Sequence, residues 1–319
     1  MSTLDPAGPA AALIARLWWV LLAICLAVFV VVCALLLHAA LRRRDRDPVD
    51  LPSPRFPSAA AERRTVGWAL LGGAGIPAVI LVGIFAVSMR AMGALEPDDE
   101  ASLTILVTGH QFWWDVVYLD VDGMPLVRTA NEIRIPVGRP VELRLASADV
   151  IHSFWVPRLA GKLDMIPGIT NVLRIVADEP GRYRGQCAEY CGVQHTRMAL
   201  VLEALPDTAF ERWLAWNRAP AVEPSPGSLA EAGREVFLRS ACVACHAIRG
   251  VRAEADLGPD LTHFAGRRTL GAAMLPNNRG NLGGWIAGPQ SVKPGIRMPA
   301  VPLPPDSLNA LLDYIASLR

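Results

Sequence analysis

Two long apolar runs near the N-terminus restrict the fold more than any other feature of this sequence. Residues 17–41 are almost entirely Leu, Val, Ala, Trp and Phe, and residues 65–90 are similarly apolar, with several glycines and one proline. At the rise of an α-helix, about 20 apolar residues cross the hydrocarbon core of a membrane. Glycine and proline are tolerated in membrane helices, where small residues allow close helix contact. We therefore expect residues 1–94 to form a transmembrane helical hairpin.

The loop between the two runs predicts the orientation of this hairpin. Seven arginines lie between residues 42 and 64, and basic residues accumulate on the cytoplasmic side of a membrane. Both termini, and everything after Met92, should then lie outside. A signal peptide cleaved near His38 is the alternative, which the length of the run and the arginines after it disfavour. A formal net charge of +1 gives no indication of a nucleic-acid partner.

Beyond the hairpin, the sequence pattern changes to short strands and then to helices. Apolar residues alternate with polar ones in segments such as 141–145, which predicts an antiparallel β-sandwich or barrel over residues 95–215. A proline-rich linker follows at 216–228. The helical periodicity after it predicts a small all-α domain over residues 229–319.

The segment Cys187-Ala-Glu-Tyr-Cys191-Gly-Val-Gln-His195-Thr-Arg-Met198 brings two thiols, an imidazole and a thioether into twelve residues. Soft sulfur donors combined with imidazole favour copper. These donors are too few to complete the coordination of two copper ions, so a second imidazole is expected from elsewhere, and His152 is the candidate. A disulfide between the two cysteines, or a zinc site, is the alternative. Neither alternative accounts for His195 and Met198.

A second metal motif, Cys242-Val-Ala-Cys245-His246, has the form Cys-x-x-Cys-His, which attaches a c-type haem. Cys242 and Cys245 would bond to the porphyrin, and His246 would be the proximal ligand of the iron. The segment from Lys293 to Pro299 resembles the one that supplies the distal methionine in small class I cytochromes c. This resemblance indicates Met298, with Met274 as the alternative.

Taken together, these residues resemble subunit II of a haem-copper cytochrome c oxidase, in the caa-type form that is fused at its C-terminus to a cytochrome c domain. The similarity covers nearly the whole chain: it rests on the two-helix anchor, the copper motif, and the segments Gly109–Trp114, Asp149–Pro157 and Lys162–Gly168. It implies a multidomain chain in which the β domain is a cupredoxin-like Greek-key barrel or sandwich. The C-terminal domain would be an all-α class I cytochrome c domain.

The resemblance also implies a binuclear CuA centre. Its side-chain ligands would be His152, Cys187, Cys191, His195 and Met198, with the backbone carbonyl of Glu189 as a further ligand. The Glu189 side chain would in addition reach a magnesium ion shared with subunit I; a carboxylate that faces water is the alternative. Two thiolates that bridge two coppers spread the transferred electron over both metals, which suits electron transfer.

The sequence departs from the family at Phe112, where relatives often carry the tryptophan through which electrons enter from soluble cytochrome c. Phe112, Trp113 and Trp114 are therefore a candidate electron relay whose role is in doubt, with packing in the core as the alternative. A second departure concerns the carboxylate that relatives often carry near the cytoplasmic end of the second helix. Glu62 lies further back and is not assigned that role.

The resulting hypothesis is the electron-entry subunit of a respiratory terminal oxidase in the bacterial plasma membrane, with both redox domains on the periplasmic side. Haem c would accept electrons from an upstream donor, such as a cytochrome c or a quinol-oxidising complex, and pass them to CuA. Subunit I, with its haem and CuB, would reduce dioxygen to water and pump protons, and subunit III would be a further partner. The CuA subunit of a nitric oxide reductase is the alternative. A copper-delivery protein would lack the haem motif.

Overall fold

The computed structural model describes residues 2–44, 58–93, 101–252 and 254–319. Met1–Ala12 and Pro97–Arg319 form one compact unit, and Leu13–Glu96 form a second. The predicted cytoplasmic loop falls mostly on residues 45–57, outside the described residues. The predicted direction of the hairpin is therefore still a prediction from the arginine pattern.

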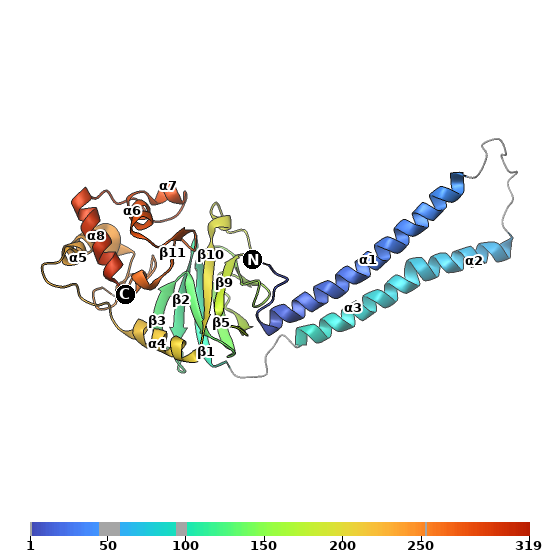
Figure 1. The fold of residues 1–319 in the computed structure, drawn as a ribbon, viewed down its shortest axis with the longest axis horizontal. Coiled ribbons are helices and arrows are strands. Elements are labelled where there is room, and N and C mark those ends of the chain that lie inside the picture. The colour runs from blue at the N-terminus through green and yellow to red at the C-terminus, as the bar shows by residue number, and fades with distance from the viewer. Residues whose placement is uncertain (1, 45–57, 94–100, 253) are drawn as a thin grey trace. The chain divides into compact units, whose positions relative to one another are not determined.

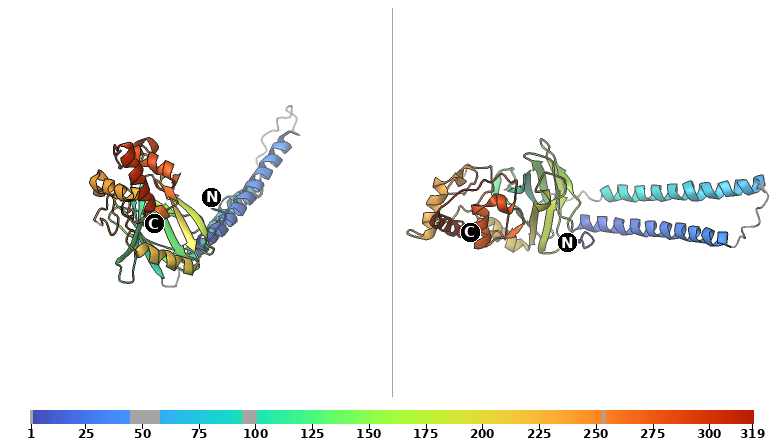
Figure 2. Two further views of the ribbon diagram at one scale, coloured as in Figure 1. Left: turned by 60° about the vertical axis from the view of Figure 1, so that its left-hand side comes forward. Right: turned by 90° about the horizontal axis from the view of Figure 1, so that it is seen from above.

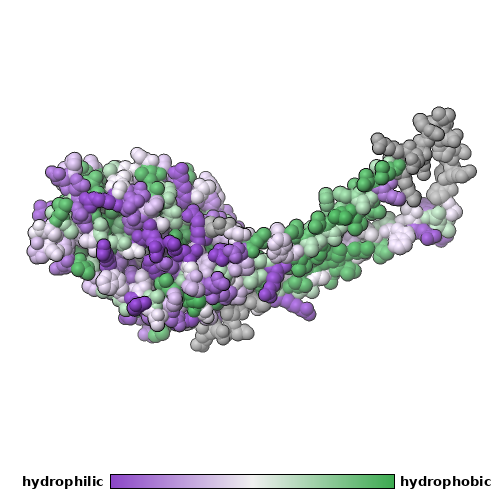
Figure 3. Space-filling view, in the orientation of Figure 1, coloured by the Kyte–Doolittle hydropathy of each residue, from purple (hydrophilic) through white to green (hydrophobic). Residues whose placement is uncertain are grey.

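Two helices in the N-terminal part are long and apolar enough to cross a membrane, at Pro9–Leu41 and Ala59–Gly93. The first is α1 (Pro9–Arg44), and the second consists of α2 (Ala59–Leu70), a π-helical turn (Leu71–Gly75) and α3 (Ile76–Gly93). Figures 1 and 2 show them running in opposite directions, and their surface is predominantly apolar (Figure 3). This agrees with the predicted pair of membrane helices.

Both helices are longer than the predicted 17–41 and 65–90. Proline suits the first turn of a helix, where its missing N–H is not needed, so α1 begins at Pro9. The second helix begins earlier because Ser58 Oγ caps it by accepting a hydrogen bond from Ala61 N at 3.3 Å. The π-helical turn ends two residues before Pro77, whose ring would clash with the preceding turn of a regular helix.

The residues before α1 pack on the β domain. Ala7 is 5% exposed, its N–H donates to the Arg158 carbonyl at 2.8 Å, and its carbonyl accepts from Asp178 N at 2.8 Å. A Cβ on Gly8 would lie 2.4 Å from the Val176 carbonyl oxygen, so only glycine allows this approach. Cleavage of a signal peptide near His38 would remove these contacts, which argues against that alternative.

The β domain consists of two five-stranded sheets packed face to face (Figure 1). The first sheet has the order β3 (Pro125–Ala130), β2 (Trp113–Leu119), β1 (Leu103–His110), β5 (Val141–Ser147) and β8 (Asn171–Ile175). The second has the order β4 (Glu132–Pro136), β10 (Ala199–Leu205), β9 (Gly181–Cys187), β6 (His152–Trp155) and β7 (Leu163–Met165). Alternate residues along β1 and β5 are buried between the sheets, as the alternation of apolar residues predicted.

The expected antiparallel arrangement is wrong at two strand pairs, because β1 pairs with β5, and β4 with β10, in parallel. The chain changes sheets after β3, β4, β5, β7 and β8. A strand that returns by such a crossover can lie parallel to its neighbour, whereas a tight hairpin makes antiparallel pairs. The cupredoxin-like sandwich predicted for this domain is confirmed.

The C-terminal domain follows the helix α4 (Asp207–Arg218) and a segment without regular structure at 219–228. Its elements are α5 (Leu229–Arg239), two 3₁₀ turns (Ala241–Ala244 and Phe264–Gly266), the hairpin β11 (Thr269–Leu270) and β12 (Leu275–Pro276), α6 (Arg279–Ala287), α7 (Pro289–Val292) and α8 (Pro305–Ser317). Helices α5 and α8 cross closely, since a Cβ on Gly233 would lie 2.0 Å from the Ala310 carbonyl oxygen. The domain has a hydrophobic core of its own, as predicted for a small helical haem domain.

Candidate functional site

Five sulfur and imidazole side chains converge at one end of the second sheet. Cys187 Sγ lies 3.8 Å from Cys191 Sγ and 3.9 Å from His152 Nδ1. Cys191 Sγ lies 3.7 Å from His195 Nδ1 and 3.8 Å from Met198 Sδ. The structure therefore brings His152, at the start of β6, to the cysteine loop that follows β9.

The donor atoms are spaced as a metal centre requires. Both cysteines are free, and two sulfurs that bind one ion at about 2.3 Å lie about 3.8 Å apart in tetrahedral geometry, which matches the observed 3.8 Å. The Glu189 carbonyl oxygen is 3.2 Å from Cys187 Sγ, within reach of the same centre. Thiolate, thioether and imidazole donors together favour copper over hard cations.

Hydrogen bonds and two glycines fix the cysteine loop. Cys187 N donates to the Met198 carbonyl at 2.8 Å, and Gln111 Nε2 donates to the Cys191 carbonyl at 2.7 Å. Gly192 has φ 127°, and a Cβ there would lie 3.0 Å from Phe112 Cζ. A Cβ on Gly109 would lie 2.8 Å from His152 Cδ2, so this glycine makes room for the imidazole.

Asp149 orients His152, a role that sequence reasoning did not assign. Its Oδ1 lies 2.9 Å from His152 Nε2, which leaves Nδ1 directed toward Cys187. Carboxylates that hold the second nitrogen of a histidine commonly fix its ring for metal binding. Burial raises the pKa of Asp149, but hydrogen bonds from His152 and the Gln111 amide outweigh it, and the pKa is lowered overall. The acidic residue three positions before His152 was the available signal.

The contact between the two thiols shifts their pKa values in opposite directions. The hydrogen bond from Cys191 is the largest effect on Cys187 and lowers its pKa to about 3, whereas the same contact raises the pKa of Cys191. Burial lowers the pKa of His152, but its hydrogen bonds to Cys187 and Asp149 raise it overall. A thiol whose pKa is lowered gives up its proton readily, as a cysteine that binds a cation must.

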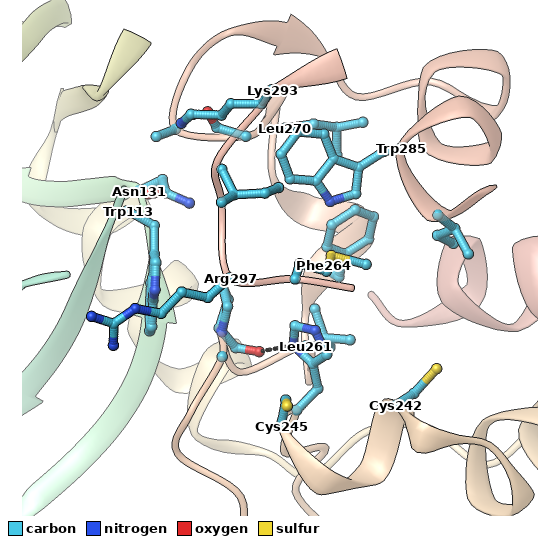
Figure 4. A pocket seen from close by; sticks show the side chains of 18 of the residues that line it. Trp113, Asn131, Cys242, Cys245, Leu261, Phe264, Leu270, Trp285, Lys293 and Arg297 are labelled. Atoms are coloured by element: carbon cyan, nitrogen blue, oxygen red, sulfur yellow. Dashed lines mark hydrogen bonds between the residues drawn. The ribbon is translucent and has the colours of Figure 1, made fainter. Parts of the chain in front are cut away.

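A cavity of about 350 Å³ lies beside the Cys-x-x-Cys-His motif, with Cys242, Cys245 and His246 in its wall (Figure 4). His246 Nδ1 lies 2.8 Å from the Pro259 carbonyl oxygen and donates to it, which leaves Nε2 free as a ligand. Burial lowers the pKa of His246, so the ring is neutral, as an iron ligand must be. Among the described residues, the wall includes Met298 and does not include Met274.

The rest of the cavity wall fits a flat apolar group that carries carboxylates. Leu261, Phe264, Trp285 and Ile286 supply apolar surface. Arg267 is 8% exposed, and its Nε has no hydrogen-bond partner among the described residues. Its Nη2 donates to the Asp260 carbonyl, so within the described chain Nε is the donor that is left free in this buried cation, and a propionate of a haem would suit it as an acceptor.

The three residues of the predicted aromatic relay lie in two different environments. Phe112 and Trp113 line the cavity together with the haem motif, and Trp113 stacks on His110 at 4.4 Å between ring centroids (Figure 4). Trp114 is fully buried in the sandwich core, with its ring centroid 6.1 Å from that of His152. Packing in the core therefore describes Trp114, while Phe112 lies between the cavity and Gly192 of the copper motif.

Comparison with known proteins agrees with this architecture. The family model for the periplasmic domain of cytochrome c oxidase subunit II matches residues 115–205, and the cytochrome c model matches residues 230–319. Cytochrome c oxidase subunit 2 of Alkalihalophilus pseudofirmus is 37% identical over 100% of this chain and 91% of its own length. The subunit 2 of Bacillus sp. (strain PS3) is 31% identical over 69% of this chain and 64% of its own length.

Among solved structures, the periplasmic domain of subunit II of the Bradyrhizobium japonicum oxidase is 30% identical over 38% of this chain and 96% of its own, with a TM-score of 0.35. The two family models together imply copper and haem c binding by a membrane protein whose redox domains are periplasmic. The protein is a subunit of an oxidoreductase complex and works with the other subunits of a cytochrome c oxidase. The chain belongs to the cytochrome c oxidase subunit II family, in a form that carries a cytochrome c domain at its C-terminus.

Proposed function

We propose that this chain is the electron-entry subunit of a respiratory terminal oxidase. Electrons from an upstream donor would pass through the C-terminal domain to the copper-binding sandwich and then to subunit I, which reduces dioxygen to water and pumps protons. The observation that carries the proposal is the proximity of the two sites. Phe112 lines the cavity of the haem motif and also contacts Gly192, the residue after Cys191.

The copper site of this proposal is binuclear. His152, Cys187, Cys191, His195 and Met198 would bind the two ions through their side chains, and Glu189 would bind through its carbonyl. When bound, a copper pair of this kind takes up and gives up one electron with little change in geometry. The sandwich buries both cysteines, Met198 and His152 to 5% exposure or less, which excludes water from the thiolates. The Glu189 carboxylate, near the same loop, is proposed to bind magnesium together with subunit I.

The haem site of this proposal uses Cys242 and Cys245 for covalent attachment, His246 as the proximal ligand and Met298 as the distal ligand. The Pro259 carbonyl holds the His246 ring through Nδ1 at 2.8 Å. Gly258 allows the approach, because a Cβ there would lie 2.9 Å from His246 Cε1. A methionine and histidine pair gives a c-type haem a relatively high potential, which suits a donor to copper.

Purification of the intact membrane complex tests this function. Pyridine-haem analysis and metal quantification should find covalent haem c and copper, and reduced donor should drive oxygen uptake. Met198→Leu should perturb the near-infrared band of the copper centre while reduction of haem c persists. A complex that consumed nitric oxide and not oxygen would contradict the proposal. So would a variant that lost haem c reduction with an unchanged copper spectrum.

A further inference from the structure

Two buried charged side chains hold the C-terminal domain against the β-sandwich. Glu132, on β4, is 4% exposed, and its Oε1 accepts hydrogen bonds from Arg268 N at 2.8 Å and from Thr269 N and Oγ1 at 3.0 Å each. Lys293, in the C-terminal domain, is 1% exposed, and its Nζ donates to the carbonyls of Phe112 at 3.0 Å and Gly271 at 2.8 Å. A buried charge is costly unless hydrogen bonds satisfy it. We call Glu132 and Lys293 the anchor residues.

The loop between β11 and β12 lies between the two anchors and depends on the sandwich for its shape. Ala272 and Ala273 have φ of 65° and 56°, in the left-handed region that residues with a Cβ seldom adopt. Their carbonyls accept hydrogen bonds from the sandwich, Ala272 from Ala199 N at 3.2 Å and Ala273 from Arg184 Nη1 at 3.3 Å. Such conformations persist where the surroundings fix them. The loop is therefore built for a docked state.

The anchor contact of Lys293 lies between the two redox sites. The chain that follows it contacts the copper loop, because Gln194 Nε2 donates to the Pro294 carbonyl at 2.6 Å and Ile296 packs against the sandwich core. Two residues later the chain reaches Met298 in the cavity wall. Figure 4 shows Lys293 and Arg297 extending toward the sandwich, on the side where Trp113 and Asn131 lie. The short segment 293–298 therefore links the two cofactor sites.

We propose that Lys293 and Glu132 are positioning residues that keep the C-terminal domain docked on the sandwich throughout turnover. The inference rests on the proposed function, since electron transfer between the two domains is what the docking serves. Each transfer moves one electron from the reduced C-terminal domain to the oxidised copper-binding domain, and no atom moves with it. The segment 219–228 then joins two docked bodies and is not a hinge. A soluble donor cannot use the covered Phe112 face and must deliver its electron to the C-terminal domain.

Intramolecular electron transfer in the intact oxidase complex tests this proposal. Lys293→Met nearly keeps the length of the side chain but removes the N–H donors of Lys293. Glu132→Ala removes the carboxylate acceptor. Glu132→Gln keeps an oxygen acceptor and should partly restore docking. Arg239→Gln is the matched control, because it also removes a charge from the C-terminal domain but from a side chain that is 82% exposed. Haem c is reduced by a light pulse, and the copper band is followed in buffers of increasing viscosity.

The wild type and Arg239→Gln should transfer the electron at a rate that does not depend on viscosity. If removing an anchor lowers the docked fraction to about a tenth, the rate falls about tenfold, because it scales with the population of the competent state. The rate should also fall further as viscosity rises, since the domain must first find its partner. Hydrogen exchange in peptides that cover 111–116 and 268–273 should increase in the same variants.

The outcomes separate this inference from the proposed function. If haem c in the wild type is reduced but the copper centre never receives the electron, the proposed function is wrong. If the wild type transfers rapidly, while Lys293→Met and Glu132→Ala keep its rate, its viscosity independence and its exchange protection, the positioning role is overturned and the function stands. The haem c and copper bands report intact sites in each variant. Glu132→Gln provides the comparison if Glu132→Ala does not fold.

Discussion

Replacing Glu132 by alanine should destabilise the C-terminal domain more than replacing any exposed acidic residue. The change removes three hydrogen bonds, at 2.8, 3.0 and 3.0 Å, from a carboxylate whose side chain is 5% exposed. It also leaves the amides of Arg268 and Thr269 without their acceptor. Each hydrogen bond to a charged group contributes about 1.5–3 kcal/mol. The Arg268 side chain is 53% exposed, so water can partly replace the lost acceptor there. We therefore expect the free energy of unfolding to fall by about 3–5 kcal/mol.

The assay is denaturant unfolding of the purified protein, followed by the haem absorbance of the C-terminal domain and by tryptophan fluorescence. Glu211→Ala is the control, since Glu211 has a side chain that is 60% exposed and pairs with Arg139 at 3.7 Å. Exposed pairs of this kind contribute about 0–1 kcal/mol. If Glu132→Ala cost no more than Glu211→Ala, the three hydrogen bonds would not carry the interface, and the reasoning would be refuted.

Three further predictions concern the copper loop, the second anchor and the N-terminus. Gly109→Ala should reduce copper affinity about 10–100-fold, as loss of an orienting contact does, because the new Cβ would lie 2.8 Å from His152 Cδ2. Metal titration measures the affinity, and an unchanged affinity would contradict this prediction. Burial lowers the pKa of Lys293 to about 8 from 10.5, so Lys293 loses its proton at a lower pH in the folded protein than in the unfolded chain. The contribution of Lys293 to the free energy of unfolding should therefore rise, by up to about 3 kcal/mol, between pH 8 and 10.5. The difference in unfolding free energy between wild type and Lys293→Met measures this rise, and a difference that stays constant with pH would refute it. Mass spectrometry of the mature protein should find Asp5, which pairs with Arg158 at 3.0 Å; a chain that begins after His38 would show that the first helix is processed.

The membrane helices and the two metal motifs could be predicted because their signals are local. The length of an apolar run can be read directly from the sequence. The four side chains of the copper motif lie within twelve residues of one another: Cys187, Cys191, His195 and Met198. The helix ends could not be predicted, because they depend on Pro9 and on the Ser58 cap, which lie outside the apolar runs. The parallel strand pairs were missed for a related reason. Alternation shows which residues of a strand are buried but not which strand lies beside it.

The interface between the two redox domains had no local signal. Glu132 and Thr269 are 137 residues apart in the sequence, and Lys293 and Phe112 are 181 apart. An acidic residue at the start of a strand, or a lysine before a Pro-Gly pair, ordinarily indicates exposed surface. Only the fold shows that both are buried and that each has backbone partners. Asp149 could be predicted only in part. Its position three residues before His152 is visible in the sequence, but its hydrogen bond to the imidazole ring is not.

The docked C-terminal domain offers a reason for phenylalanine, in place of the family's tryptophan, at position 112. Taken from the sequence alone, the absence of tryptophan at this position weakens an entry point for a soluble donor. In the structure the Phe112 side chain is buried, its carbonyl accepts from Lys293, and its ring lies against Gly192. A position that is permanently covered is not selected for transient docking, and its ring need only fill the space beside the copper loop. The smaller aromatic side chain is therefore consistent with a partner that does not leave.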